Sequence, residues 1–130
     1  MLGEMLGEVR GKVTGQRVLQ DGKVEVSFQQ SGKVLGVDLS EMGTYSTELR
    51  SDGTLFGEGQ GVHMYANGDT AAWKGGGVGK FTRPGAVSFR GAIYFQTKSE
   101  KLARLNTVAV VFEYEADENG NTHAKVWEWK

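Results

Sequence analysis

The chain has 130 residues, which is enough for one folded domain and too few for two independent hydrophobic cores. Its 15 basic and 16 acidic residues leave a net charge of −1, so the sequence offers neither the basic face that nucleic acid requires nor an attraction to anionic membranes. The chain contains no cysteine, which excludes disulfides, cysteine-ligated zinc and thiol nucleophiles.

Nothing in the sequence indicates export or membrane insertion. Residues 1–10 lack the basic and apolar regions of a secretory signal. The longest purely apolar run, Val108 to Phe112, is far shorter than a membrane-spanning segment. We therefore expect a cytoplasmic protein with a single domain over residues 1–130.

Glycine is unusually frequent and proline unusually rare. The chain has 20 glycines and 1 proline, and many of the glycines stand among Val, Phe, Trp and Tyr in segments that otherwise resemble strands. A glycine inside a strand marks a bend, a bulge or the close approach of another group. The composition therefore predicts strongly curved strands, as a small barrel requires.

Turn signals divide the chain into short segments with period-2 alternation, which is typical of antiparallel strands. The turn signals are Asp21-Gly22, Asp52-Gly53, Asn67-Gly68, Pro84-Gly85 and Asn119-Gly120. The expected strands are 8–19, 23–31, 33–39, 43–50, 54–66, 69–82, 86–97, 106–116 and 122–129. A meander of this length closes into a barrel or folds as a sandwich, and the sequence favours an all-β, closed, antiparallel up-and-down barrel of about eight strands.

One segment has a different pattern. Ser99 is a favourable N-cap, and helix-forming residues follow it. Leu102 and Leu105 are three residues apart, so they lie on one face of a helix. We expect a short helix near residues 99–105 that covers one mouth of the barrel.

The turn geometry sets which side chains face inward. A two-residue turn at Asn67-Gly68 would pair Val62 with Trp73 and Gln60 with Gly75. In that register, and with Asp52-Gly53 as the preceding turn, the inner face comprises Tyr45, Thr47, Leu49, Phe56, Glu58, Gln60, Val62, Met64, Ala71 and Trp73. His63 then lies on the outer face.

The C-terminal half follows the same reasoning. A three-residue loop at Asn119-Gly120 pairs Glu113 with Lys125 and Glu115 with His123 on the outside. The inner face then comprises Val108, Val110, Phe112, Tyr114, Ala124, Val126 and Glu128. In segment 86–97 we expect Val87, Phe89, Ile93 and Phe95 inside and Arg90, Tyr94 and Gln96 outside, although a one-residue shift at Pro84-Gly85 would reverse this assignment.

Inward polar groups beside glycines predict a ligand cavity. Glu58 and Gln60 share the expected inner face with Phe56 and Trp73, opposite Gly75 and Gly77, which have no side chains. The expected ligand-binding residues are Tyr45, Phe56, Glu58, Gln60, Trp73, Phe112, Tyr114 and Glu128, and the expected ligand is a small, largely apolar or amphipathic molecule. The alternative is that Glu58 and Glu128 lie at the barrel rims in water or pair with Arg10 or Arg17.

Chemistry beyond binding has less support. Glu58 and Glu128 are the candidate acid–base residues of an isomerase or cyclase. No metal or cofactor is expected, because neither histidine has a partner at metal-ligand spacing and the glycine run at Lys74–Thr82 lacks the pattern of a phosphate-binding loop. Trp127 and Trp129 are expected on the outer face beside Val111, where they predict a homo-oligomeric or scaffold interface.

Several runs carry a resemblance to a known group of proteins. They are Gly57–Val62, Trp73–Gly79, Phe89–Gly91, Glu113–Glu115 and Trp127–Trp129. Together they resemble an uncharacterised bacterial family that is similar in architecture to the allene oxide cyclase and dirigent barrels. The resemblance implies an eight-stranded barrel, often oligomeric, with a small-molecule lumen. Such cyclases hold an unsaturated fatty-acid epoxide while a carboxylate assists ring closure, and dirigent relatives steer radical coupling. The resemblance assigns no catalytic residue here.

Overall fold

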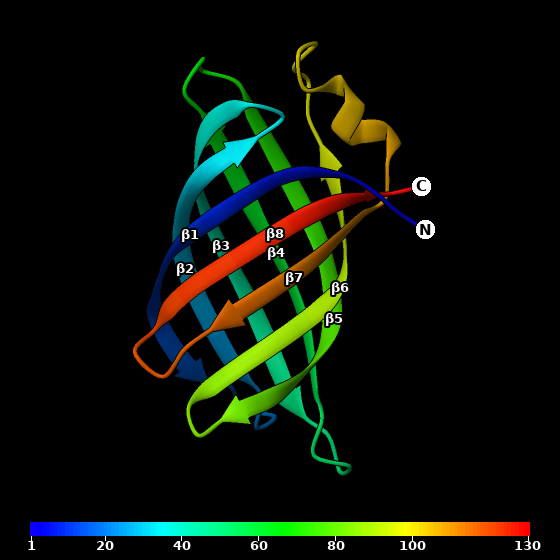
Figure 1. Ribbon diagram of the computed structural model, residues 1–130. Coiled ribbons are helices and arrows are strands. Elements are labelled where there is room, and N and C mark those ends of the chain that lie inside the picture. The colour runs from blue at the N-terminus through cyan, green and yellow to red at the C-terminus, as the bar shows by residue number, and fades with distance from the viewer.

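The computed structural model describes residues 1–130 as a closed antiparallel barrel of eight strands, in which each strand pairs with the next and β8 returns to β1 (Figure 1). The elements are β1 (Leu2–Val18), β2 (Val24–Val34), β3 (Val37–Leu49), β4 (Leu55–Tyr65), β5 (Thr70–Arg83), β6 (Ala86–Gln96), the 3-10 helix η1 (Ala103–Thr107), β7 (Val110–Ala116) and β8 (Asn121–Trp129). The fold class predicted from the sequence is confirmed. No helix is long and apolar enough to span a membrane.

The four Asx-Gly turns share one geometry. At Asn67-Gly68, Tyr65 and Asp69 close the hairpin, the amide of Gly68 donates to the carbonyl of Tyr65, and Gly68 has a φ of 89°. This is a three-residue loop that ends in a left-handed glycine. The turns at Asp21-Gly22, Asp52-Gly53 and Asn119-Gly120 have the same pair of backbone hydrogen bonds and a glycine with positive φ.

This geometry corrects the predicted facing of β4. The loop is one residue longer than a two-residue turn, so Gly61, and not Val62, pairs with Trp73. A one-residue shift moves every side chain of a strand to the other face. The residues that point outward are therefore Phe56, Glu58, Gln60, Val62 and Met64, whereas the inner face of β4 carries Leu55, Gly57, Gly59, Gly61, His63 and Tyr65.

The facing of the other strands agrees better with prediction. The turn at Asp52-Gly53 is also one residue longer than a two-residue turn. This second shift compensates for the shift at Asn67-Gly68, so Tyr45 and Thr47 face inward as predicted. Leu49, at the end of β3, is exposed. In the C-terminal half, Glu113 pairs with Lys125 and Glu115 with His123, and the inward and outward residues of segment 86–97 are as predicted.

One turn was not expected. Segments 33–39 and 43–50 were predicted as separate strands, but the chain reverses at Leu35-Gly36, where both residues have positive φ, of 52° and 76°. Val34 pairs directly with Val37 across this two-residue turn. The residues predicted to form a loop, 40–42, lie inside β3.

The inner glycines make room for aromatic rings. Five inward aromatic residues each pair with a glycine on a neighbouring strand: Phe28 with Gly43, Tyr45 with Gly59, Trp73 with Gly61, Phe89 with Gly79 and Phe112 with Gly91. A Cβ atom on Gly61 would lie 2.5 Å from the indole of Trp73. The rings therefore lie across bare backbone, and the barrel interior accommodates more aromatic volume than its diameter would otherwise allow.

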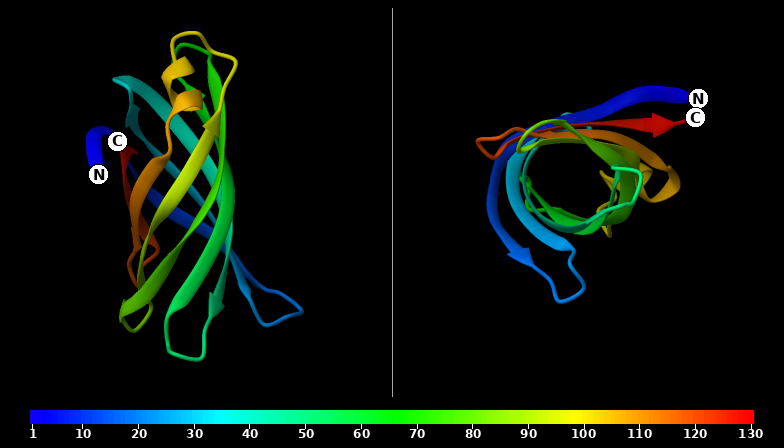
Figure 2. Two further views of the ribbon diagram at one scale, coloured as in Figure 1. Left: turned by 90° about the vertical axis from the view of Figure 1, so that its right-hand side faces the viewer. Right: turned by 90° about the horizontal axis from the view of Figure 1, so that it is seen from below.

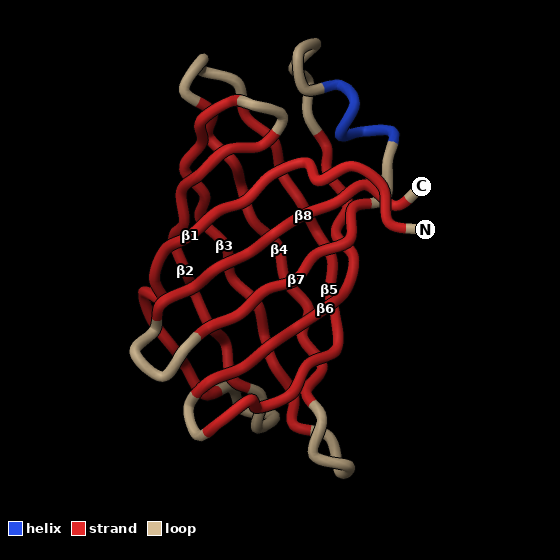
Figure 3. The backbone as a smooth tube through the Cα atoms, viewed as in Figure 1, coloured by secondary structure: helices blue, strands red, loops and turns tan.

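The connection between β6 and β7, which carries the only helical turn, lies at one rim of the barrel (Figure 3). Leu102 and Leu105 are completely buried there. The hydroxyl of Ser99 accepts a hydrogen bond of 3.2 Å from the amide of Leu102. The prediction that Ser99 is the N-cap of the helical turn is wrong, because Leu102 occupies that position. The regular turn is a 3-10 helix that begins only at Ala103, later than the expected 99–105 helix.

The chain termini and the first hairpin lie outside the barrel wall (Figure 2). Leu2 pairs with Trp129, and the amide of Lys130 donates to the carbonyl of Met1 at 2.7 Å, so the two ends run side by side. After a bulge between Val13 and Gly15, the end of β1 projects from the wall together with the start of β2.

Candidate functional site

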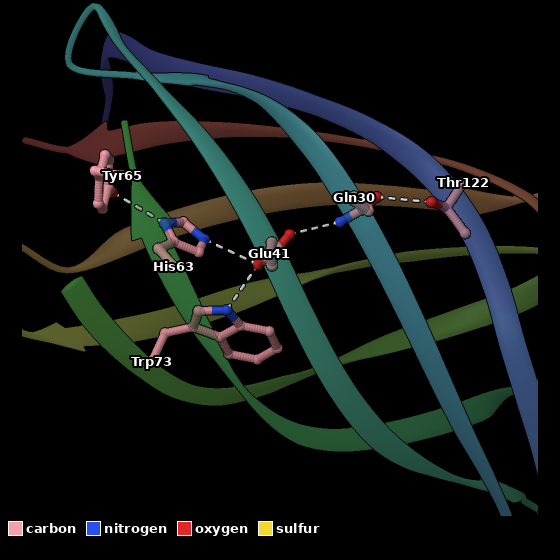
Figure 4. A network of polar contacts seen from close by, with 6 residues as sticks. All are labelled: Gln30, Glu41, His63, Tyr65, Trp73 and Thr122. Atoms are coloured by element: carbon pink, nitrogen blue, oxygen red, sulfur yellow. Dashed lines mark hydrogen bonds and ion pairs between the residues drawn. The ribbon is translucent and has the colours of Figure 1, made fainter. Parts of the chain in front are cut away.

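A buried carboxylate lies at the centre of a polar network inside the barrel (Figure 4). Glu41 projects inward from β3, and its side chain is only 6% exposed. Its Oε1 accepts a hydrogen bond of 2.7 Å from Gln30 Nε2, and its Oε2 accepts one of 2.8 Å from Trp73 Nε1. His63 Nε2 lies 2.9 Å from the same Oε2. Three partners on three other strands therefore hold one carboxylate.

Further contacts extend the network at both ends. The Tyr65 hydroxyl lies 3.0 Å from His63 Nδ1, and the Thr122 hydroxyl donates to Gln30 Oε1 at 2.8 Å. The connected residues come from β2, β3, β4, β5 and β8, so the network ties together distant parts of the wall. Every polar atom in it has a partner, as a polar cluster in a low-dielectric interior requires.

His63 bridges a tyrosine and a carboxylate. Burial, with a contribution from the charge of Glu41, raises the pKa of Tyr65, so its hydroxyl stays protonated at neutral pH. This hydroxyl shares a hydrogen bond with His63 Nδ1, and Nε2 of the same ring shares one with Glu41. The imidazole therefore links the two groups through both of its nitrogens.

A second polar group, formed by Tyr45 on β3 and Tyr114 on β7, also faces the lumen. The hydroxyls of Tyr45 and Tyr114 lie 3.4 Å apart. Burial raises the pKa of both tyrosines, so both remain protonated at neutral pH. Only one hydroxyl can donate to the other, which leaves one O–H free for another acceptor. The two rings pack with Phe28 and Phe89 at centroid separations between 5.6 and 6.4 Å.

A cavity of about 90 Å³ lies between these two polar groups. The side chains around it include Phe28, Gln30, Glu41, Tyr45, His63, Trp73, Phe89, Ile93, Phe112, Tyr114, Ala124 and Val126, and part of its wall is the bare backbone of Gly57, Gly59, Gly75 and Gly77. An apolar cavity of about 150 Å³ holds benzene, so in proportion this one suits a molecule of about four non-hydrogen atoms. No lysine or arginine lines it.

The structure separates the sequence-predicted site residues into three groups. Tyr45, Trp73, Phe112 and Tyr114 surround the cavity together. The expectation that Phe56 and Gln60 also line it is wrong, because the longer Asn67-Gly68 loop turns them outward; they border an open groove on the barrel's outer surface, with Lys74 and Arg90. Glu58 borders both the cavity and this groove, and its side chain is exposed. Glu128 lies at the barrel rim.

The environment of Glu128 matches the alternative of a paired rim residue, although its partner is neither Arg10 nor Arg17. Its side chain is 18% exposed and accepts a hydrogen bond of 2.9 Å from Arg104, which also binds Glu4. Trp127 lies on the outer face opposite Val111, as expected, and Trp129 is exposed beside Leu2. The interface predicted there stays a prediction.

Three functional candidates were missed from the sequence: Gln30, Glu41 and His63. His63 was expected on the surface, but it is 3% exposed and faces inward because of the register correction in β4. His123 is on the outer face as expected, next to Glu8. Glu41 was expected in a loop between two strands. It lies four residues before Tyr45, so in a continuous strand through residues 37–49 both side chains point to the same, inner face.

Comparisons with known proteins support the barrel. No protein-family model and no curated protein matches the chain. A solved protein of unknown function from Clostridium acetobutylicum is 16% identical, with a TM-score of 0.84 over 98% of this chain and 99% of that one. Another, from Rhodopseudomonas palustris, is 12% identical, with a TM-score of 0.81 over 98% and 97%.

Two further solved structures have the same architecture. A beta-barrel-like protein from Acinetobacter baumannii is 12% identical, with a TM-score of 0.81 over 100% of this chain and 96% of that one. An enzyme from Penicillium herquei is 16% identical, with a TM-score of 0.63 over 96% and 92%. At these identities the likeness establishes the fold alone, and none of the comparisons names an allene oxide cyclase or a dirigent protein.

Proposed function

We propose that the barrel lumen binds one small, largely apolar molecule whose polar group is held between Glu41 and the Tyr45–Tyr114 pair. The observation that carries the proposal is the cavity of about 90 Å³, walled by aromatic rings and bordered by a buried carboxylate. An apolar cavity with a few convergent polar groups is the usual form of a ligand site. Small eight-stranded barrels have room for one such ligand.

The polar network is also difficult to explain by stability. A buried charge and its partners contribute no more to stability than well-packed apolar side chains of the same volume, and often less. Glu41, Gln30 and His63 nevertheless occupy the middle of the interior, where aliphatic residues would suffice for packing. A binding role accounts for this arrangement.

The size of the cavity limits the ligand. Sites for drug-sized or lipid-sized molecules measure about 300–1,000 Å³, several times the volume found here. The fatty-acid epoxide implied by the family resemblance therefore does not fit the lumen in this conformation. The proposed ligand is a compact molecule, or one compact end of a longer molecule.

The three tryptophans provide a direct test by NMR. The indole N–H of Trp73 donates to Glu41 beside the cavity, whereas Trp127 and Trp129 lie on the outer face. Titration with 1-propanol or acetone should shift the Trp73 indole resonance saturably and leave the other two unchanged. Absence of saturation, or equal shifts in all three indoles, would refute the proposal.

A matched pair of variants strengthens this test. Ala124 lines the cavity, and Ala72 lies on the outer face of β5. Ala124→Val should weaken the binding of either probe at least tenfold by filling the space, while Ala72→Val should leave it unchanged. Equal affinities in the two variants would place the binding site elsewhere.

A second candidate is acid–base catalysis, favoured by the 2.9 Å contact between Glu41 and His63. In this reaction Glu41 removes a proton from the carbon next to a carbonyl, the electron pair moves onto the carbonyl oxygen, and the free tyrosine hydroxyl donates to that oxygen. Return of the proton to another carbon completes an isomerisation. In D₂O, an enzyme of this kind should exchange deuterium into acetone faster than buffer does, and Glu41→Gln should abolish the excess rate. Recovery of acetone without added deuterium would refute the catalytic function and leave ligand binding as the remaining proposal.

A further inference from the structure

The ionisable groups around the lumen are mainly acidic. Three glutamates, Glu8, Glu41 and Glu58, border the cavity, and no lysine or arginine reaches it. Of the three, only Glu41 has its side chain buried in the interior, where it contacts His63. The two tyrosines beside the cavity remain protonated and uncharged. The buried carboxylate therefore has no lysine or arginine as a counter-ion.

The remaining hydrogen-bonding capacity lies on the same carboxylate. Oε2 of Glu41 accepts from Trp73 and His63, whereas Oε1 accepts only from Gln30. A carboxylate oxygen has two acceptor positions, so Oε1 can accept one more N–H or O–H. Gln30 Oε1 likewise accepts only from Thr122. Two acceptors at this end of the cavity are thus available to a ligand that donates hydrogen bonds.

The other walls suit the same kind of ligand. Phe28, Phe89 and Phe112 line the cavity together with Tyr45 and Tyr114. Aromatic faces carry a negative quadrupole that attracts cations, most strongly where water is excluded. An anion in this space would meet the carboxylate of Glu41, with no lysine or arginine beside it, and the same aromatic faces, and both interactions are unfavourable.

From these observations we infer that the ligand is a small primary amine, bound as its ammonium ion with one N–H directed at Glu41 and its short alkyl chain against the aromatic rings. This inference rests on the proposed lumen-binding function and names the ligand class for that site. It also predicts that carboxylates and phosphates of the same size are excluded.

Three probes of similar size and different charge test the inference on the unmodified protein. They are propylammonium, 1-propanol and propionate, each titrated while the Trp73 indole resonance is followed. Propylammonium should bind at least tenfold more tightly than 1-propanol, and propionate should not saturate the signal. If none of the three saturates it, the lumen-binding function itself fails. If 1-propanol or propionate binds as tightly as propylammonium, the function stands and the amine assignment is wrong.

Two glutamine variants locate the selectivity. Glu41→Gln removes the buried carboxylate and should lower the affinity for propylammonium at least tenfold while changing that for 1-propanol less than threefold. Glu48→Gln removes a carboxylate from the outer face of β3, away from the cavity, and should change neither affinity. An equal loss for both probes in Glu41→Gln would indicate a packing defect and would overturn the charge-based reading.

Discussion

The pairing of inward aromatic rings with glycines makes a quantitative prediction for Gly61→Ala. The added Cβ would lie 2.5 Å from the Trp73 indole, so the ring must move. Movement of the ring breaks its 2.8 Å hydrogen bond to Glu41. Overpacking costs about 1–3 kcal/mol, and the loss of a hydrogen bond to a charged group adds about 1.5–3 kcal/mol. We therefore expect the free energy of unfolding to fall by about 2.5–6 kcal/mol, a large part of the stability of a small domain.

Gly15→Ala is the matched control, because a Cβ atom at this bulge in β1 would have no neighbour within 4 Å. In urea unfolding, the free energy of unfolding of Gly15→Ala should lie within about 0.5 kcal/mol of that of the unmodified protein. The Trp73 indole resonance should move in Gly61→Ala and stay in place in Gly15→Ala. If the two variants unfold at the same urea concentration, the glycine–aromatic pairing does not limit the packing of this barrel.

Three other perturbations have defined outcomes. Glu41→Ala leaves its hydrogen-bond donors unpaired in the interior and should lower the free energy of unfolding in urea by about 3–5 kcal/mol. Glu58→Ala, which replaces an exposed side chain on the outer face, should change this free energy by less than about 0.5 kcal/mol. Leu105→Ala opens a cavity under the β6–β7 connection and should lower the free energy of unfolding by about 2–5 kcal/mol. Burial raises the pKa of Tyr65 and Tyr114 above the ordinary tyrosine value of 10.0, so their contribution to stability is fully present below pH 10 and should fall as the pH rises further. Unchanged unfolding midpoints between pH 9 and 11 would contradict this.

The barrel itself was predictable from local signals. Glycines with positive φ follow Asp or Asn at four of the hairpins, and alternation marks the strands between them. These features specify most of the reversals and the antiparallel order. The reversal at Leu35-Gly36 was not predictable in this way, because a leucine at a φ of 52° is rare and the sequence contains no turn signal there.

The site depended on a finer property, the length of each loop. Asx-Gly is compatible with both two-residue and three-residue loops, and the choice between them decides which face of β4 is buried. The outer face of β4 carries Phe56, Val62 and Met64, so hydrophobicity favoured the wrong register. The buried face consists largely of glycines whose partners are aromatic rings on other strands. Only the pairing between strands reveals that these glycines belong inside.

The neighbouring positions of the first and last strands have a consequence for how this barrel can be built. Met1 and Lys130 share a backbone hydrogen bond, and β1 and β8 form a ladder like any other pair in the wall. A short peptide joining these residues, with new ends opened at the exposed Ser51–Gly53 loop, would preserve all eight strand pairings in a circularly permuted chain. The ring of strands, and not their order along the polypeptide, defines the interior that surrounds Glu41.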